Sequence, residues 1–113
     1  MDEQIKTCLF DVLQSINEID SYFTNISSKQ FEVYSKDTRT KRAVERNLEI
    51  IGEAVNRILQ YDSGFELANA QKIIGTRNRI IHGYDSVSDE TIRSIVINHL
   101  PKLKKEIKVL LQP

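Results

Sequence analysis

The sequence has little of what would place it among several broad classes of protein. It contains one cysteine, Cys8, which excludes an internal disulfide and a metal site built from several thiolates, and suits a reducing cytosol. Its first residues, Met1-Asp2-Glu3-Gln4, are acidic and lack the apolar stretch of a signal peptide. No apolar run approaches the roughly 20 residues that span a bilayer. We therefore expect a soluble, cytoplasmic protein with no membrane partner, in which Cys8 is a small buried residue.

An excess of charge of either sign is also absent. Sixteen Lys and Arg residues balance sixteen Asp and Glu residues in a chain of 113. Proteins that coat nucleic acid in general are usually strongly basic, so the balance excludes that class, and a site for a polyanion must be a local patch. The length is sufficient for one well-packed core and too short for two, which predicts a single domain over residues 1–113.

Apolar residues recur at steps of three and four along most of the chain, which predicts an all-α fold. We expect a first helix capped by Asp2 and ending near Asn25, then a loop with at most one short turn around Phe31. A second helix should run from Asp37 or Thr38 to about residue 60. It carries two neighbouring apolar stripes, which predicts a central helix with neighbours on two sides. The stripes are Val44, Leu48, Ile51, Val55, Ile58 and Leu59, and Ala43, Asn47, Ile50 and Ala54.

The second half of the chain predicts two more long helices. Ser63 and Glu66 fit a capping box for the start of the third helix, and Asn69 is the alternative start. Ser88, followed by two acidic residues, predicts the start of the fourth helix. Pro101 lacks the amide of the helical ladder and clashes with the preceding turn, so a kink or break is expected just before it. The sum is an antiparallel up-and-down bundle of four to five helices.

The richest chemistry lies in the segment Arg77-Asn78-Arg79-Ile80-Ile81-His82-Gly83-Tyr84, where two arginines, an amide, an imidazole and a phenol fall within eight residues. From Leu67 through Tyr84 there is no acidic side chain to neutralise them. Arginine offers a permanent, forked match to phosphate oxygens, and the pKa of histidine lies near neutrality. The segment would suit a phosphate.

The helical wheel places Arg77 on an apolar face and His82 elsewhere. At about 100° per residue, Arg77 lies near 40° from Ile73, inside the apolar arc of the third helix, and His82 lies near 180°. A guanidinium is costly to bury alone, so Arg77 must find a carboxylate, backbone carbonyls or a cleft. Bringing His82 to it requires that the helix open near Gly83, or that the site be assembled from two copies of the chain.

Arg77, four residues, His82, one residue and Tyr84 resemble the R-x4-H-x-Y motif of HepT-like toxins in the HEPN superfamily. The block from Arg46 to Ala54 looks like the second-helix signature of that family, and Lys72-Ile73-Ile74-Gly75 looks like its approach to the motif. The resemblance covers most of the chain. It implies a homodimeric helical bundle in which paired motifs line a cleft.

The resemblance also implies a function. It implies the toxin of a type VII-like toxin–antitoxin system, a metal-independent endoribonuclease without a cofactor that acts on tRNA or mRNA. His82 would then be the general acid or base, Arg77 would bind the scissile phosphate, and Asn78 would orient the pair. Arg79 either steers phosphates by binding RNA or is a solvated charge. Tyr84 would be adenylylated by an MntA-type nucleotidyltransferase antitoxin; otherwise it packs on the next helix or holds a phosphate.

Other interpretations remain at this point. HEPN-type bundles also serve as non-catalytic nucleotide-binding or scaffolding partners of nucleotidyltransferases, with the motif as a docking or modification site. A purely structural bundle is the third interpretation. Glu53 is either a solvent carboxylate or the partner of an arginine, and His99 lies on an apolar stripe as a core or interface histidine.

Overall fold

A computed structural model describes residues 1–23, 31–82 and 87–112, and these residues form helices and no strand. Within these ranges, no helix combines the length and the apolar character needed to cross a bilayer. The predicted all-α class is confirmed. The elements are α1 (Glu3–Tyr22), α2 (Phe31–Lys36), α3 (Thr38–Tyr61), α4 (Ala70–His82), α5 (Asp89–Ser94), the π-helix η2 (Ile95–His99) and α6 (Leu100–Leu111).

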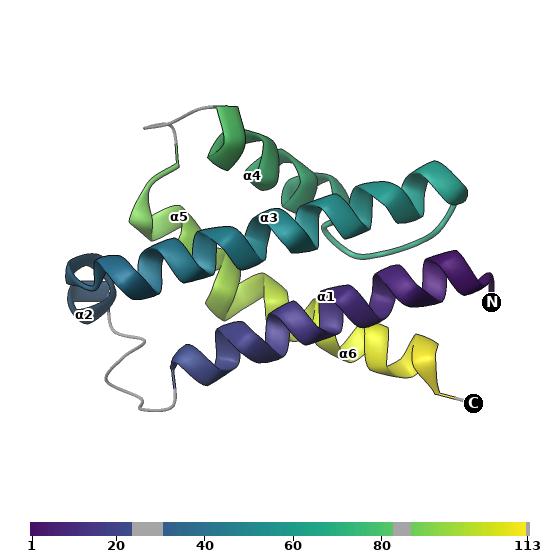
Figure 1. The fold of residues 1–113 in the computed structure, drawn as a ribbon, viewed down its shortest axis with the longest axis horizontal. Helices are drawn as coiled ribbons and strands as arrows, with labels where there is room; N and C mark the ends of the chain where they lie inside the picture. Colours follow the sequence, from purple (N-terminus) through teal and green to yellow (C-terminus); the bar gives the residue numbers. More distant parts are fainter. Residues whose placement is uncertain (24–30, 83–86, 113) are drawn as a thin grey trace.

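The long helices alternate in direction along the chain (Figure 1). The fourth long element consists of α5, η2 and α6, which follow one another without an intervening loop. Helix α3 contacts α1 on one side and α4 on the other, while α6 packs against α1. The antiparallel up-and-down arrangement and the central position of α3 are both as predicted.

Asp2 and Ser88 cap their helices as predicted, and the predicted start of the second helix near Asp37 is also confirmed. Asp2 accepts from the backbone N–H of Gln4 and Ile5, at 2.7 and 3.2 Å. Asp37 caps α3 by accepting from a backbone N–H at 3.1 Å, and Ser88 caps α5 in the same way, also at 3.1 Å. Each cap satisfies amide groups that have no partner within the helix.

In the first half of the chain, the end of the first helix cannot be compared fully with the prediction, and the predicted loop contains a helix. Helix α1 ends at Tyr22, and Asn25, where the prediction ended it, lies outside the described residues. Where the sequence predicts at most one short turn, α2 is a helix of six residues. Tyr34 of α2 is fully buried and its ring lies 6.2 Å from that of Phe23. This tertiary packing stabilises a helix too short to persist alone.

The predicted capping box at Ser63 is wrong, because α4 begins only at Ala70. Ser63 and Glu66 are both exposed. Asp62 instead accepts two backbone hydrogen bonds from the residues that follow it, at 3.0 and 3.1 Å, which closes a turn. Asn69 has φ 62°, a left-handed conformation through which an α-helix cannot continue. The alternative start near Asn69 is therefore correct.

The break expected before Pro101 is present and takes the form of the π-helix η2. Pro101 has no N–H to donate to the carbonyl four residues earlier. The hydrogen-bond ladder shifts by one residue just before it, so that the N–H of Leu100 donates to the carbonyl of Ile95. Pro101 then occupies the first turn of α6, where a missing amide costs nothing.

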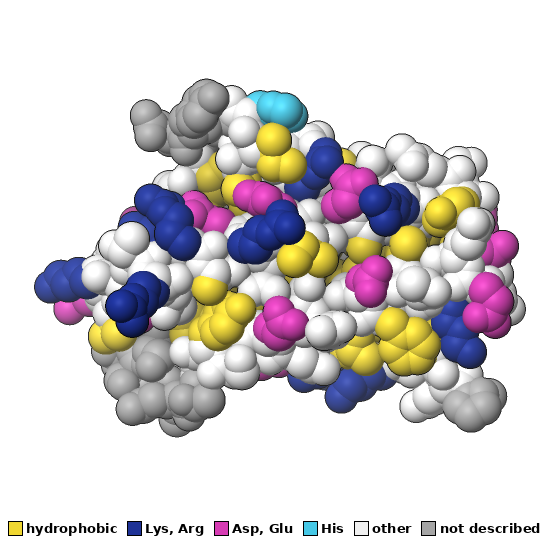
Figure 2. All heavy atoms as spheres, in the orientation of Figure 1, with side chains coloured by type: hydrophobic (Ala, Val, Ile, Leu, Met, Phe, Trp, Pro, Cys, Tyr) yellow, Lys and Arg dark blue, Asp and Glu magenta, His cyan; other side chains and the backbone are white. Residues whose placement is uncertain are grey.

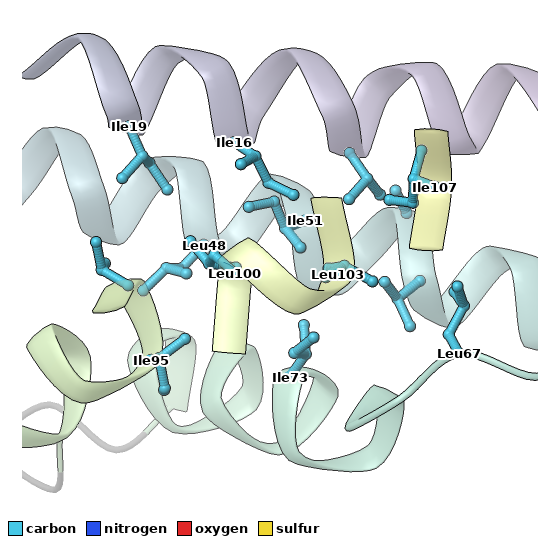
Figure 3. Close-up of a cluster of buried hydrophobic side chains, with 14 of the residues drawn as sticks. Ile16, Ile19, Leu48, Ile51, Leu67, Ile73, Ile95, Leu100, Leu103 and Ile107 are labelled. Carbon is cyan, nitrogen blue, oxygen red and sulfur yellow. The ribbon is translucent and has the colours of Figure 1, made fainter. Parts of the chain in front are cut away.

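The core lies between α1, α3, α4 and α6 (Figure 3). Each large apolar side chain buried there stabilises the fold by about 1.5–3 kcal/mol relative to an exposed position. Helix α4 contributes least among the long helices, since its buried residues are Ala70, Ile73 and Thr76. The helix that carries the motif therefore lies at the side of the bundle. Core residues with at most 2% of their surface exposed include Leu9, Val12, Ile16 and Ile19 of α1, Val44, Leu48, Ile51, Val55 and Ile58 of α3, and Leu100, Leu103 and Ile107 of α6.

Helices α3 and α4 approach each other closely at Gly52. A Cβ atom placed on Gly52 would lie 2.3 Å from Cβ and 2.7 Å from Cγ of Arg77. Both distances are far below van der Waals contact, and Cβ of Arg77 is bonded directly to the backbone of α4, so relief of this contact requires the helix itself to shift. The absence of a side chain at Gly52 is what allows the two helices to meet there.

Replacing Gly52 by Ala is therefore expected to destabilise the protein, although alanine is the better helix former. Overpacking at this contact should lower the free energy of unfolding by about 1–3 kcal/mol. Gly75→Ala is the matched control, because a Cβ at Gly75 would meet no atom within 4 Å. That variant should gain about 0.5–1 kcal/mol from helix propensity. Chemical denaturation followed by circular dichroism compares them, and equal stability of the two variants would contradict the close approach.

Candidate active site

Arg77 lies between α4 and α3 with its side chain 24% exposed. Its Nη2 donates to Oε2 of Glu53 at 2.7 Å. The helical wheel predicts an arginine on an apolar face that needs a compensating partner, and that partner is a carboxylate on the neighbouring helix. Glu53 is therefore the partner of an arginine and not an isolated solvent carboxylate.

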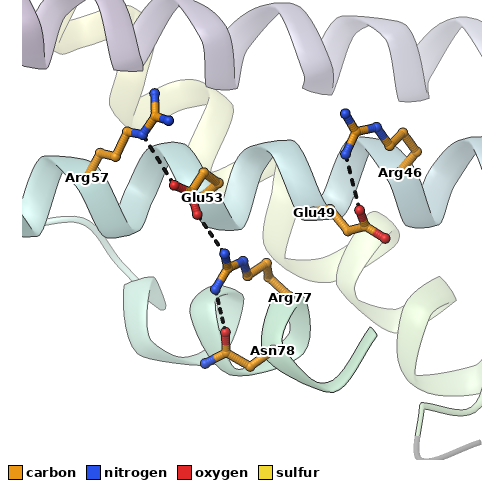
Figure 4. A network of polar contacts seen from close by, with 6 residues as sticks. All are labelled: Arg46, Glu49, Glu53, Arg57, Arg77 and Asn78. Atoms are coloured by element: carbon orange, nitrogen blue, oxygen red, sulfur yellow. Dashed lines mark hydrogen bonds and ion pairs between the residues drawn. The ribbon is translucent and has the colours of Figure 1, made fainter. Parts of the chain in front are cut away.

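Two further contacts extend this ion pair into a network (Figure 4). The second oxygen of Glu53, Oε1, accepts from Nε of Arg57 at 3.2 Å. Nη1 of Arg77 donates to Oδ1 of Asn78 at 2.7 Å. Arg57 and Glu53 come from α3, and Arg77 and Asn78 come from α4. The network thus fixes the guanidinium of Arg77 from two sides.

The segment around the motif has no acidic residue in its sequence, but an acidic residue of another helix lies beside it in the fold. From Leu67 to Tyr84 the sequence offers no negative charge. Glu53 nevertheless supplies one across the interface between the helices, 24 residues away along the chain. The carboxylate that Arg77 requires thus comes from another helix and not from its own segment.

A cleft of about 410 Å³ opens beside Arg77, with walls from α1, α3 and α4. Three arginines and three carboxylates line it, so their formal charges of +3 and −3 cancel. Basic and acidic side chains lie next to one another over α3 and α4 (Figure 2). The described walls therefore carry both signs of charge and are not the basic patch expected for a polyanion. The lining residues are Cys8, Asp11, Arg46, Glu49, Ile50, Glu53, Ala54, Arg57, Arg77 and Ile81.

His82 is exposed and is the last residue of α4. On a regular helix it lies about 140° around the axis from Arg77 and about 7.5 Å along it. Helix α4 continues through His82, so the opening that would bring the two side chains together does not occur before Gly83. Gly83 and Tyr84 lie outside the described residues. Among the described residues of one chain, the polar partners of Arg77 are Glu53 and Asn78, and His82 is not one of them.

Comparison with known proteins gives the family. The family described as "Ribonuclease HepT-like" matches residues 12–110. This chain belongs to the HepT-like ribonuclease family.

Similar proteins come from an archaeon and a bacterium. Two are from Methanocaldococcus jannaschii: "Putative RNase MJ0127" is 29% identical over 97% of this chain and 89% of its own length, and "Putative RNase MJ1380" is 32% identical over 94% and 95%. "Putative RNase TTE0752" of Caldanaerobacter subterraneus subsp. tengcongensis is 31% identical over 86% and 88%. No solved structure matches this chain significantly.

Among the motif residues of this HepT-like chain, the structure brings Arg77 and Asn78 together and leaves His82 apart. Arg79 is exposed on α4. Sequence reasoning missed Gly52 as the contact point for Arg77. The available signal was a glycine inside a long helix that continues without a break, which often marks a close approach.

His99 and Cys8 lie where the sequence predicts, within or beside the core. His99 is half-buried at the end of η2, and its Nδ1 is buried without a hydrogen-bond partner in the described part of the chain. Burial lowers its pKa, and the charges of Lys72 and Lys102 lower it further, so the neutral form is favoured. Cys8 is a buried free thiol whose pKa is raised, first by burial and then by the charge of Asp11.

Proposed function

We propose that this HepT-like protein is a metal-independent endoribonuclease and the toxin of a toxin–antitoxin pair. The proposal depends mainly on the position of Arg77 in the structure of this chain, which belongs to a ribonuclease family. Its guanidinium is fixed from two sides at the wall of a cleft that is open to solvent. Such a permanently charged, oriented group is suited to hold a phosphate during reaction.

RNA cleavage without a metal needs three functions. A base takes the proton of the 2′-hydroxyl, which attacks the phosphorus, and an acid protonates the leaving 5′-oxygen. A fixed cation stabilises the charge on the pentavalent phosphorane between these steps. We assign the cation to Arg77, the base or acid to His82, and the orientation of Arg77 to Asn78. The products are a 2′,3′-cyclic phosphate and a 5′-hydroxyl.

The separation of Arg77 and His82 within one chain supports a site composed from two chains. His82 is exposed at the end of its helix, where a neighbouring molecule can reach it. Ile81 beside it is 38% exposed, although it is large and apolar. A homodimer in which the motif of one chain faces the motif of the other would bring an imidazole to each guanidinium.

Tyr84 provides the proposed means of control. It follows His82 by two residues, close to the end of α4. A partner nucleotidyltransferase of the MntA type would transfer AMP from ATP to its hydroxyl and release pyrophosphate. The added nucleotide carries negative charge and bulk, so it would hinder RNA at the site both electrostatically and sterically.

A second candidate function is a non-catalytic nucleotide-binding or scaffolding partner of a nucleotidyltransferase. The paired charges of the cleft favour it, because the carboxylate of Glu53 already occupies one N–H of Arg77. In that case the motif would be a docking or modification site only.

Replacing His82 by Ala is expected to lower RNA cleavage by at least about 100-fold, because it removes the proton-transfer group. The exposed site predicts a change in unfolding free energy within about 0.5 kcal/mol. The assay uses total RNA including tRNA, with EDTA present, and compares the purified wild type with the variant. Gln71→Ala, an exposed change on the same helix, is the control and should cleave like the wild type.

Undiminished cleavage by His82→Ala would overturn the assignment of His82. Intact mass must first show that Tyr84 carries no AMP. If the unmodified wild type then cleaves no RNA, the binding-partner function replaces the ribonuclease.

Incubation with a nucleotidyltransferase antitoxin and ATP is expected to add the mass of one or more AMP units to the wild type. Tyr84→Phe has no hydroxyl to accept them and should gain no mass. Modified wild type should also lose RNA cleavage. The same mass increase in both proteins, or none in the wild type, would refute modification at Tyr84.

A further inference from the structure

The guanidinium of Arg77 is held by only part of its hydrogen-bonding capacity. Arginine has five N–H donors in a planar fork. Among the described residues, one N–H of Nη2 goes to Glu53 and one of Nη1 goes to Asn78. Each of these nitrogens has a second N–H that the two contacts do not use. The group is therefore oriented and still able to donate to a phosphate.

The side chain of Glu53 is itself restrained. It lies on the central helix α3, directly after Gly52, whose missing side chain lets the stem of Arg77 approach. Its two carboxylate oxygens bind two different arginines, Arg77 at 2.7 Å and Arg57 at 3.2 Å. A carboxylate restrained at both oxygens loses the rotational freedom that would let it follow a moving partner.

Arg57 also affects the charge around Arg77. If Glu53 paired with Arg77 alone, the pair would have no net charge and would attract a phosphate only weakly. Glu53 is instead shared between two guanidinium groups, Arg57 and Arg77, within a cleft whose formal charges cancel overall. Because one carboxylate serves two cations, it can restrain Arg77 without fully neutralising it.

We propose that Glu53 is a positioning residue that holds the guanidinium of Arg77 in the orientation in which it receives the scissile phosphate, while Arg57 restrains Glu53. The proposal rests on the proposed ribonuclease function for the identity of the phosphate. Glu53 does not touch the RNA. It acts through Arg77, and its loss changes the reaction of bound RNA more than the binding of RNA.

Two variants of Glu53 test this role in cleavage. Glu53→Ala removes the restraint and should lower kcat by about 10–100-fold with less than about a threefold change in KM, as expected when a reacting group is misplaced. Glu53→Gln keeps the size of the side chain and one acceptor oxygen, and should recover kcat to within about tenfold of the wild type. A merely structural role would lower the melting temperature of Glu53→Ala and leave kcat of the folded enzyme unchanged, which would overturn the proposal.

A second measurement does not depend on cleavage. Side-chain ¹⁵N NMR reports how freely the guanidinium of Arg77 rotates about its C–N bonds. The wild type and Glu53→Gln should show restricted rotation, and Glu53→Ala should show free rotation. Glu49→Ala is the matched control: Glu49 pairs with Arg46 at 3.2 Å on the same helix and should leave the Arg77 signal unchanged.

The two measurements separate the possible failures. If the wild type does not cleave RNA but Arg77 is released only in Glu53→Ala, the ribonuclease function fails and the positioning role stands. If Arg77 rotates freely in the wild type, or equally slowly in Glu53→Ala, the positioning role fails whatever the cleavage assay shows. Should Glu53→Ala not fold, Glu53→Gln with unrestricted rotation would refute the proposal equally.

Discussion

Where α3 and α4 meet at Gly52, one contact serves both packing and electrostatics. The stem of Arg77 occupies the space that a side chain at Gly52 would fill. The next residue of α3, Glu53, receives the guanidinium. Because the two residues are adjacent on a rigid helix, the distance between the helix axes also sets the geometry of the ion pair. Any change that separates the helices moves the arginine as well, so the fold and the site cannot vary independently here.

The elements that the sequence predicts well are those governed by local rules. Asp2 and Ser88 cap their helices because a short acceptor side chain before a helical run needs no information from elsewhere. The central place of α3 follows from the width of its apolar face. Ser63 does not begin a helix, because Asp62 closes a turn there and Asn69 adopts a left-handed conformation. Both features depend on the path by which the connection crosses from α3 to α4, which local rules do not specify.

The candidate site depends on relations that no local pattern contains. The wheel predicts that Arg77 needs a partner, since that follows from one helix. It cannot predict that the partner is Glu53, because the answer depends on the rotation and separation of two helices. In the same way, Pro101 predicts a break, whereas the π form of η2 arises from the register in which the ladder resumes.

The uneven burial along α4 has a consequence for its motion. Its buried residues are Ala70, Ile73 and Thr76, all in the part that precedes Arg77. Beyond Arg77, no described side chain of the helix is fully buried. Local opening costs least where few contacts are lost, so the stretch from Asn78 to His82 should separate from the bundle more cheaply than the whole chain unfolds. The ion pair of Arg77 with Glu53 then lies at the boundary between the part of α4 that is anchored in the core and the part that can open locally. The motif has residues on both sides of this boundary.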